Sequence, residues 1–173
     1  MNRLLFAFSL AAACSSAALA APTPRLPPET QAWLATSPNI VVRMETLPAM
    51  GILQPMVAIR GNRFGGGFIE PTIHGTLKNG QEVAIIPLLS GGSMGVADAL
   101  VFTKLGGKRK FVGDLPTPGG HLLITVSDGM IQTSVAMYKM GDSMATPSKR
   151  YITKYTLDGI RLVRVRASEE SAK

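Results

Sequence analysis

Short apolar runs separated by glycine-containing pairs fill the chain between residues 39 and 166. Alternation of apolar and polar residues is typical of strands that bury one face. The pairs are of the kind that tight hairpins favour, because asparagine, aspartate and glycine accept positive φ angles. They are Asn79-Gly80, Gly106-Gly107, Asp128-Gly129 and Asp158-Gly159. Their successive separations of 27, 22 and 30 residues predict an antiparallel β meander.

The hairpin around Asp128-Gly129 shows the pattern most clearly. A two-residue turn there places apolar residues of both strands on one face and polar residues on the other. The expected partners are Val126 with Ile131, Ile124 with Thr133, and Leu122 with Val135. This arrangement is typical of an antiparallel sheet with one face in the core.

The same reasoning gives partners at two other turns. Around Gly106-Gly107, Phe102 is expected opposite Phe111, a pair worth about 0.5–1 kcal/mol. A two-residue turn at Asp158-Gly159 pairs Tyr155 with Leu162 and Tyr151 with Arg166. Further strands are expected at residues 39–44 and 56–60, and the glycine-rich segments 61–67 and 90–95 are expected to be loops or bulges.

Helical signals are confined to the N-terminal part. Residues 28–34 begin with proline, have an early acidic residue and contain Trp33 as an anchor, which predicts a short helix. The predicted fold class is therefore mainly β: an antiparallel meander forming a sandwich or a barrel-like domain, with a short N-terminal helix.

The first 20 residues are typical of an export signal. Arg3 precedes an apolar stretch at residues 4–13, and Ala18-Leu19-Ala20 fits a cleavage site before Ala21. The alternative is a lipoprotein anchored at Cys14. We expect a signal peptide at 1–20, a proline-rich linker at 21–28, one β-rich domain at 29–166 and a flexible tail at 167–173. No apolar run reaches the ~18 residues that a membrane-spanning helix needs.

Composition limits the class of protein further. An apolar content of 46% excludes a disordered chain. Because Cys14 is the only cysteine, the processed chain has neither a disulfide nor a catalytic thiol. A cysteine-free exported domain fits a periplasmic or secreted location.

Positive charge is concentrated in the C-terminal half. Residues 104–173 contain twelve basic and six acidic residues, whereas residues 21–103 contain five of each. An exported basic protein is expected to meet anionic envelope polymers or lipid surfaces rather than nucleic acid. The expected ligand-binding residues, close together on the last predicted hairpin with only Asp158 to offset them, are Lys149, Arg150, Lys154, Arg161, Arg164 and Arg166.

One enzymatic alternative rests on the segment Gly91-Gly92-Ser93-Met94-Gly95, which matches the G-x-S-x-G nucleophile elbow. Ser93 would be the nucleophile, with Asp114 and His121 following as acid and base. The elbow requires a strand before the serine, here residues 83–89, and a helix after it, here residues 96–104. The predicted hairpins argue against that helix, so catalysis is the secondary hypothesis.

A second alternative is copper binding. Met137, Met140 and Met144 place three thioethers in one short segment, and soft thioethers select Cu(I). Against this, methionine commonly fills irregular gaps in a core, and Lys139 nearby would repel a cation. His74 and His121 are too far apart in sequence to form a recognisable metal motif, so we expect no metal site of that kind and no cofactor.

Four short segments within residues 75–165 form a recognisable pattern, at residues 111–114, 119–122, 142–149 and 155–159. Through these segments, residues 75–165 resemble a group of small secreted bacterial proteins that includes the LppP/LprE lipoproteins. The family has adjacent cysteines where this chain has Ala145 and Thr146, so a disulfide or thiol role there is absent. The resemblance implies an exported, envelope-associated, β-rich protein and no particular activity. The resulting hypothesis is a non-enzymatic envelope protein that binds an anionic ligand or surface.

Overall fold

The computed structural model describes residues 25–47, 51–60, 66–90, 95–115, 122–142 and 147–171. Within these residues, one helix and eleven strands follow one another along the chain. The helix is α1 (Pro28–Leu34), as predicted. The strands are β1 (Ile40–Leu47), β2 (Ile52–Ile59), β3 (Gly67–Ile69), β4 (Ile73–Thr76), β5 (Glu82–Leu89), β6 (Val96–Leu105), β7 (Lys108–Asp114), β8 (Leu122–Ser127), β9 (Met130–Met137), β10 (Lys149–Asp158) and β11 (Arg161–Ser171).

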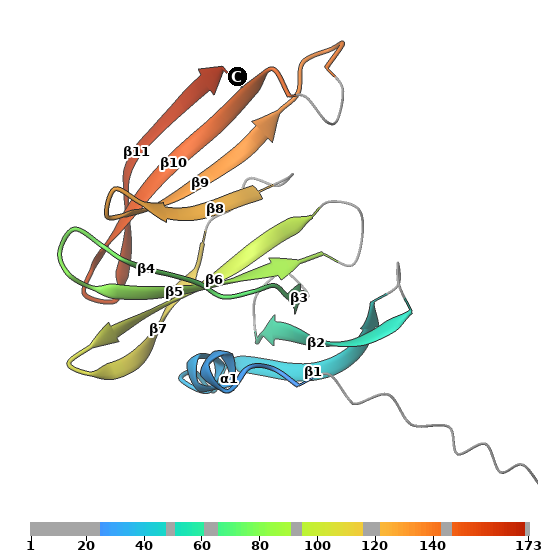
Figure 1. Ribbon diagram of the computed structural model, residues 1–173, viewed down its shortest axis with the longest axis vertical. Coiled ribbons are helices and arrows are strands. Elements are labelled where there is room, and N and C mark those ends of the chain that lie inside the picture. The colour runs from blue at the N-terminus through green and yellow to red at the C-terminus, as the bar shows by residue number, and fades with distance from the viewer. Residues whose placement is uncertain are drawn as a thin grey trace, which may run out of the picture.

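The strands form two antiparallel sheets (Figure 1). The first sheet has the order β1-β2-β3-β5-β6-β7, and β4 also pairs with β5. The second sheet is the meander β11-β10-β9-β8. Strands β3 and β4 lie end to end along the same side of β5, because Pro71 falls between them and cannot donate a backbone hydrogen bond. The predicted mainly β, antiparallel fold class is confirmed, in its sandwich form.

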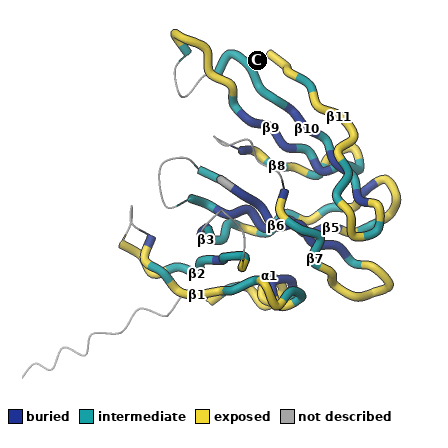
Figure 2. Tube along the Cα trace, turned by 180° about the vertical axis from the view of Figure 1, so that it is seen from behind, coloured by how far each residue is buried: buried dark blue, intermediate teal, exposed yellow. Residues whose placement is uncertain are grey.

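The core lies in two layers on either side of β5 and β6 (Figure 2). Val83 and Ile85 face the second sheet, where they join Ile131 and Tyr155 in one cluster. The alternate residues of β5 and β6 face α1 and β2 and form a second cluster around Trp33. Because β5 is buried on both faces, its sequence is a nearly continuous apolar run rather than an alternating one.

Two hairpins have the register that the sequence predicts. The β8–β9 turn consists of Asp128 and Gly129, both with positive φ, and the three expected residue pairs are present. The β6–β7 turn consists of Gly106 and Gly107, and Phe102 faces Phe111 with ring centroids 5.3 Å apart. In both cases the turn residues allow the twist that joins two antiparallel strands directly.

The other two turns differ from the prediction. Around Asn79-Gly80 the loop has three residues, because Leu77 N donates to Gln81 O across it. The last hairpin turns at Gly159 and Ile160 instead of Asp158 and Gly159. In this turn only the first central residue, Gly159, has a positive φ, so the second position can be taken by Ile160.

The shifted turn changes the residue pairing of β10 with β11. Leu157 now faces Leu162, and both contribute to the core between the sheets. The predicted pairs Tyr155–Leu162 and Tyr151–Arg166 are therefore wrong: Tyr155 faces Arg164 and Tyr151 faces Glu169. The predicted flexible tail is also wrong for residues 167–171, which continue β11 in register with β10.

Candidate functional site

The six predicted cations lie on the two neighbouring strands β10 and β11, but they do not share one face. Tyr155 and Leu157 point into the core between the sheets. Residues that alternate with them on β10, including Arg150 and Lys154, therefore point away from the first sheet. We call this the outer face of the second sheet, which is made of β8, β9, β10 and β11.

A bulge in β11 decides which cations reach this outer face. The register of the β10–β11 pair shifts by one residue between Lys154 and Tyr155, so Arg164 faces Tyr155 while Arg166 faces Lys154. An extra residue reverses the two faces of a strand beyond it. Arg166 thereby lies on the outer face directly opposite Lys154, whereas Arg164 lies on the inner face beside Tyr155.

Lys154, Arg166 and Arg150 form the cationic centre of the outer face. Arg150 Nη1 lies 3.4 Å from the Ser134 hydroxyl oxygen, and Glu170 is its cross-strand neighbour. Among the described residues, neither Lys154 nor Arg166 has an acidic partner within ion-pair distance. Two like charges directly opposite each other in a sheet destabilise it, so this pair favours an anion placed between them.

The remaining predicted cations contribute less to this centre. Lys149 Nζ lies 2.8 Å from Glu169 Oε2, and this ion pair lowers the pKa of the Glu169 carboxyl. Arg161 lies at the turn end of the outer face, opposite Asp158. The expectation that all six charges gather together, offset only by Asp158, is therefore wrong. The bulge leaves Arg164 on the inner face, and the end of β11 places Glu169 and Glu170 opposite β10.

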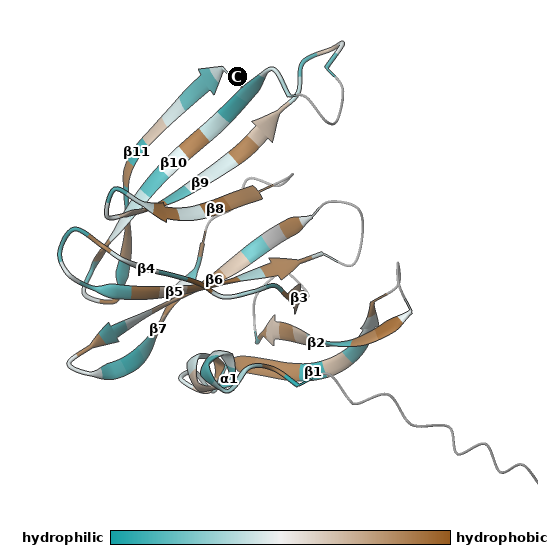
Figure 3. Ribbon diagram, viewed as in Figure 1, coloured by the Kyte–Doolittle hydropathy of each residue, from teal (hydrophilic) through white to brown (hydrophobic). Residues whose placement is uncertain are grey.

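Exposed apolar side chains lie next to two of these cations in the sequence. Ile160 in the β10–β11 turn and Val165 at the bulge are both largely exposed. Ile160 adjoins Arg161, and Val165 adjoins Arg166. Figure 3 shows hydrophilic colour along much of β10 and β11, interrupted by hydrophobic bands. Cations mixed with exposed apolar groups are suited to the interface of a lipid layer.

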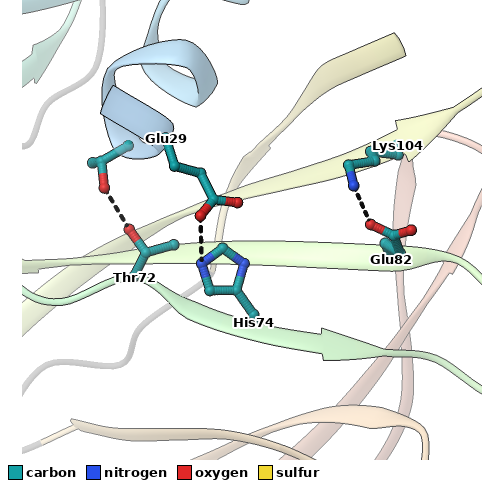
Figure 4. Close-up of polar contacts among 6 residues, drawn as sticks. Glu29, Thr72, His74, Glu82 and Lys104 are labelled. Carbon is teal, nitrogen blue, oxygen red and sulfur yellow. Dashed lines mark hydrogen bonds and ion pairs between the residues drawn. The ribbon is translucent and has the colours of Figure 1, made fainter. Parts of the chain in front are cut away.

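A second polar region lies between α1 and the first sheet (Figure 4). It is a hollow of about 290 Å³ lined by Glu29, Trp33, His74, Glu82 and Lys104, among others. His74 Nε2 lies 3.9 Å from Glu29 Oε2, and the Lys104 ammonium contacts the Glu82 carboxylate. His74 and Lys104 thus each have a carboxylate beside them, which makes the hollow a poorer anion site than the outer face.

The enzymatic alternative lacks the local structure that it needs. Ser93 and His121 lie outside the described residues, and Asp114 is the last residue of β7. The segment expected to form the elbow helix is strand β6, hydrogen-bonded between β5 and β7. A nucleophile elbow requires a strand followed by a helix, so the hypothesis that residues 96–104 form that helix is wrong.

One titratable group was missed by the sequence analysis. Asp98, 6% exposed on β6, accepts a hydrogen bond of 2.7 Å from its neighbour's backbone, Ala99 N. Burial raises the pKa of the Asp98 carboxyl to about 6; the hydrogen bond opposes this, and the nearby Asp114 charge adds to it. The available signal was an acidic residue inside a strand of otherwise apolar character.

The positions of the methionines add little support to the copper-binding hypothesis. Met137, at the end of β9, and Met140 are exposed, so neither fills a gap in the core. Met144 lies outside the described residues. Over the part of the chain that the structure describes, no three His, Cys, Asp or Glu residues come together in a way that could hold a metal ion.

Two further observations bear on the class of protein. No helix in the described segments is long and apolar enough to cross a membrane. Comparison of the chain with protein-family models, curated proteins and solved structures gave no match.

Proposed function

We propose that this chain is an exported, non-enzymatic protein of the cell envelope that binds an anionic surface through the outer face of its second sheet. The observation that supports this most directly is the cross-strand pair of Lys154 and Arg166, which has no acidic partner among the described residues. A phosphate between the two side chains would relieve their repulsion and accept hydrogen bonds from both.

An extended surface suits this site better than a small molecule. Side chains on one face of a sheet point outward side by side, so Arg150, Lys154 and Arg166 can contact several phosphates at once. The exposed Ile160 and Val165 add apolar contact at the same hairpin. An anionic lipid layer or a phosphate-rich envelope polymer presents repeated phosphates in this way, and an envelope location is what the N-terminal segment and the LppP/LprE resemblance lead us to expect.

The test compares two matched pairs of charge changes. Binding to phosphatidylglycerol vesicles is measured by co-sedimentation over a salt series, with phosphatidylcholine vesicles as the uncharged control. The variant Lys154→Gln/Arg166→Gln is expected to weaken binding at least about tenfold, because each cation near an anionic surface contributes about 1 kcal/mol. Wild-type affinity is expected to fall steeply with salt, since the charges are screened.

The matched control is Lys108→Gln/Lys110→Gln, which removes the same charge from β7. If the control loses as much affinity as the outer-face variant, the protein responds to net charge alone and the proposed site is wrong. Absence of binding at low salt, or binding that does not change with salt, would also exclude it.

Export is tested separately from binding. The protein recovered from cells is expected to begin at Ala21, which intact-mass measurement would show. A chain that begins at a lipid-modified Cys14 would favour the anchored alternative. A chain that retains Met1 and stays inside the cell would contradict the envelope location.

A further inference from the structure

Strand β1 lies at one edge of the first sheet, and among the described residues its only hydrogen-bonded neighbour in the sheet is β2. The β1–β2 register runs without a shift from Ile40 to Leu47. Strand β2 pairs with β3 only at Met56 and Val57, so the outer half of the hairpin projects beyond the rest of the sheet (Figure 1). An edge of this kind can accept another strand.

Two of the other edge strands, β7 and β11, have features that discourage such pairing, and the remaining edge of the second sheet, β8, is a shorter strand. Strand β7 begins with three consecutive cations, and β11 has a bulge and several charged residues. Natural proteins protect edges with charges and bulges of this sort. Strand β1 contains neither proline, glycine nor bulge, and its only charged residues are Arg43 and Glu45.

The backbone of β1 shows which residues face the open edge. Arg60 N donates to Asn39 O, whereas Ile40 N turns away from β2 and donates to Ser37 O. In an antiparallel ladder the backbone groups of alternate residues point to opposite sides. Val42, Met44 and Thr46 therefore direct their N–H and C=O groups toward the free edge, where a further strand would bond.

We propose that a second copy of this chain pairs with β1, antiparallel and about a two-fold axis at Met44. That register places Val42 opposite Thr46 of the second copy and Met44 opposite its own equivalent, so all the free-edge groups form hydrogen bonds. It also places Arg43 opposite Glu45 of the second copy. A two-fold interface uses the same surface twice, so the opposite-charge pair forms twice.

Charge selects this register over its neighbours. Arg43 and Glu45 already lie on one face, with Arg43 Nε 3.2 Å from Glu45 Oε1. An axis at Arg43 would oppose two guanidinium groups, and an axis at Glu45 would oppose two carboxylates. Direct opposition of like charges is unfavourable, whereas opposite charges stabilise a cross-strand pair. Only the axis at Met44 brings both residues opposite their complements.

The second face of the hairpin gains apolar contact in the same arrangement. Val42, Met44 and Leu53 share this face and are 43%, 37% and 43% exposed. Helix α1 covers only the beginning of this surface, at a groove lined by Leu34, Ile40 and Val42, among others. Pairing at Met44 makes the apolar faces of the two copies continuous, and Figure 3 shows β1 as hydrophobic over much of its length.

The test uses charge reversal and sedimentation equilibrium. Wild-type protein is expected to dimerise, and Arg43→Glu or Glu45→Arg alone is expected to weaken the dimer at least about tenfold, because each variant places like charges opposite each other. Mixing the two variants is expected to restore a dimer containing one copy of each, since the complementary charges then face each other again.

Two controls separate this interface from other effects. The double variant Arg43→Glu/Glu45→Arg is expected to dimerise like wild type, which shows that the single changes do not act through misfolding. Lys108→Glu, on the opposite edge strand β7, is expected to leave the dimer intact. In the dimer, amide exchange at Val42, Met44 and Thr46 is expected to be slower than in dilute protein.

Several results would overturn the proposal. They are a wild type that stays monomeric at the highest soluble concentration, a dimer that both single variants leave unchanged, and a mixture that fails to restore it. Binding of monomeric wild type to uncharged vesicles through Met44 would point to a lipid layer as the occupant instead. These outcomes are independent of the anionic-surface proposal, which concerns the other sheet.

Discussion

At the scale of single residues, the buried Asp98 makes stability depend on pH. Its pKa rises from 3.8 to about 6, chiefly because burial disfavours the charged form. The folded protein therefore binds this proton more tightly than the unfolded chain. The contribution of Asp98 to the free energy of unfolding is greatest when both states are protonated, and it falls as pH rises from about 4 to about 6.

Replacement of Asp98 by asparagine tests this dependence. The amide oxygen that Asp98→Asn introduces can still accept the hydrogen bond from Ala99 N, but it has no charge. The stability of the variant relative to wild type is expected to rise between pH 4 and 7 by on the order of 1–3 kcal/mol. Urea unfolding at a series of pH values measures this difference, and a difference that does not change with pH would contradict the prediction.

Asp142 is expected to show the opposite sign. Its carboxylate accepts hydrogen bonds of 2.8 Å from the backbone N–H groups of Lys139 and Ser148, which lower its pKa. Its stabilising effect is present above the unfolded pKa of 3.8 and is lost as pH falls through the lower folded value. Asp142→Asn should therefore be less stable than wild type at neutral pH, and the gap should close in acid. Urea unfolding at neutral and acidic pH measures this gap.

At the scale of elements, Gly75 controls how closely β4 approaches β8. A Cβ placed at Gly75 would lie 2.6 Å from Val126 Cβ, far inside normal contact. Its backbone has no positive φ, so the demand for glycine here comes from packing alone. We expect Gly75→Ala to destabilise the protein by about 1–3 kcal/mol, as overpacking in a core does.

The compensating change makes this prediction specific. In the Val126→Gly background both the Cβ of residue 126 and its methyl groups are gone, so Gly75→Ala should cost much less than in wild type. A double-mutant cycle by chemical denaturation measures the coupling between the two positions. Independent, additive effects of the two substitutions would show that the sheets do not meet at this point.

The hairpins show how far local sequence determines the fold. At Asp128-Gly129 and Gly106-Gly107 both turn positions accept positive φ, so the loop length and the register follow from the sequence. At Asp158-Gly159, the glycine allows either of two turns, one at residues 158–159 and one at residues 159–160. The second turn pairs Leu157 with Leu162 in the core between the sheets, and this packing decides between the two turns. Local patterns thus located the turn, whereas packing against the other sheet fixed its register.

The candidate site was only partly predictable for the same reason. The sequence locates the cations on two neighbouring strands, but the face of each side chain depends on the bulge at Val165 in β11, opposite Lys154 and Tyr155. Without the bulge and with the earlier turn, Arg166 would face Tyr151 on the inner side. No glycine marks this bulge, so nothing local indicated that Arg166 would join Lys154.

At the scale of the whole molecule, the two core clusters share their supporting strands. Residues of β5 and β6 alternate between the cluster facing the second sheet and the cluster around Trp33. Loss of either cluster exposes one face of both strands. We therefore expect the two layers to unfold together, as most single domains of this size do.

A substitution in one layer can test this cooperativity through a probe in the other. Ile131 on β9 is fully buried in the cluster between the sheets, and Trp33, the only tryptophan, reports on the other cluster. Ile131→Ala is expected to cost about 2–5 kcal/mol. If the strands couple the layers, the urea midpoint seen by Trp33 fluorescence should fall with that seen by far-ultraviolet circular dichroism. A fluorescence midpoint that stayed at its wild-type value would mean that the second sheet unfolds on its own.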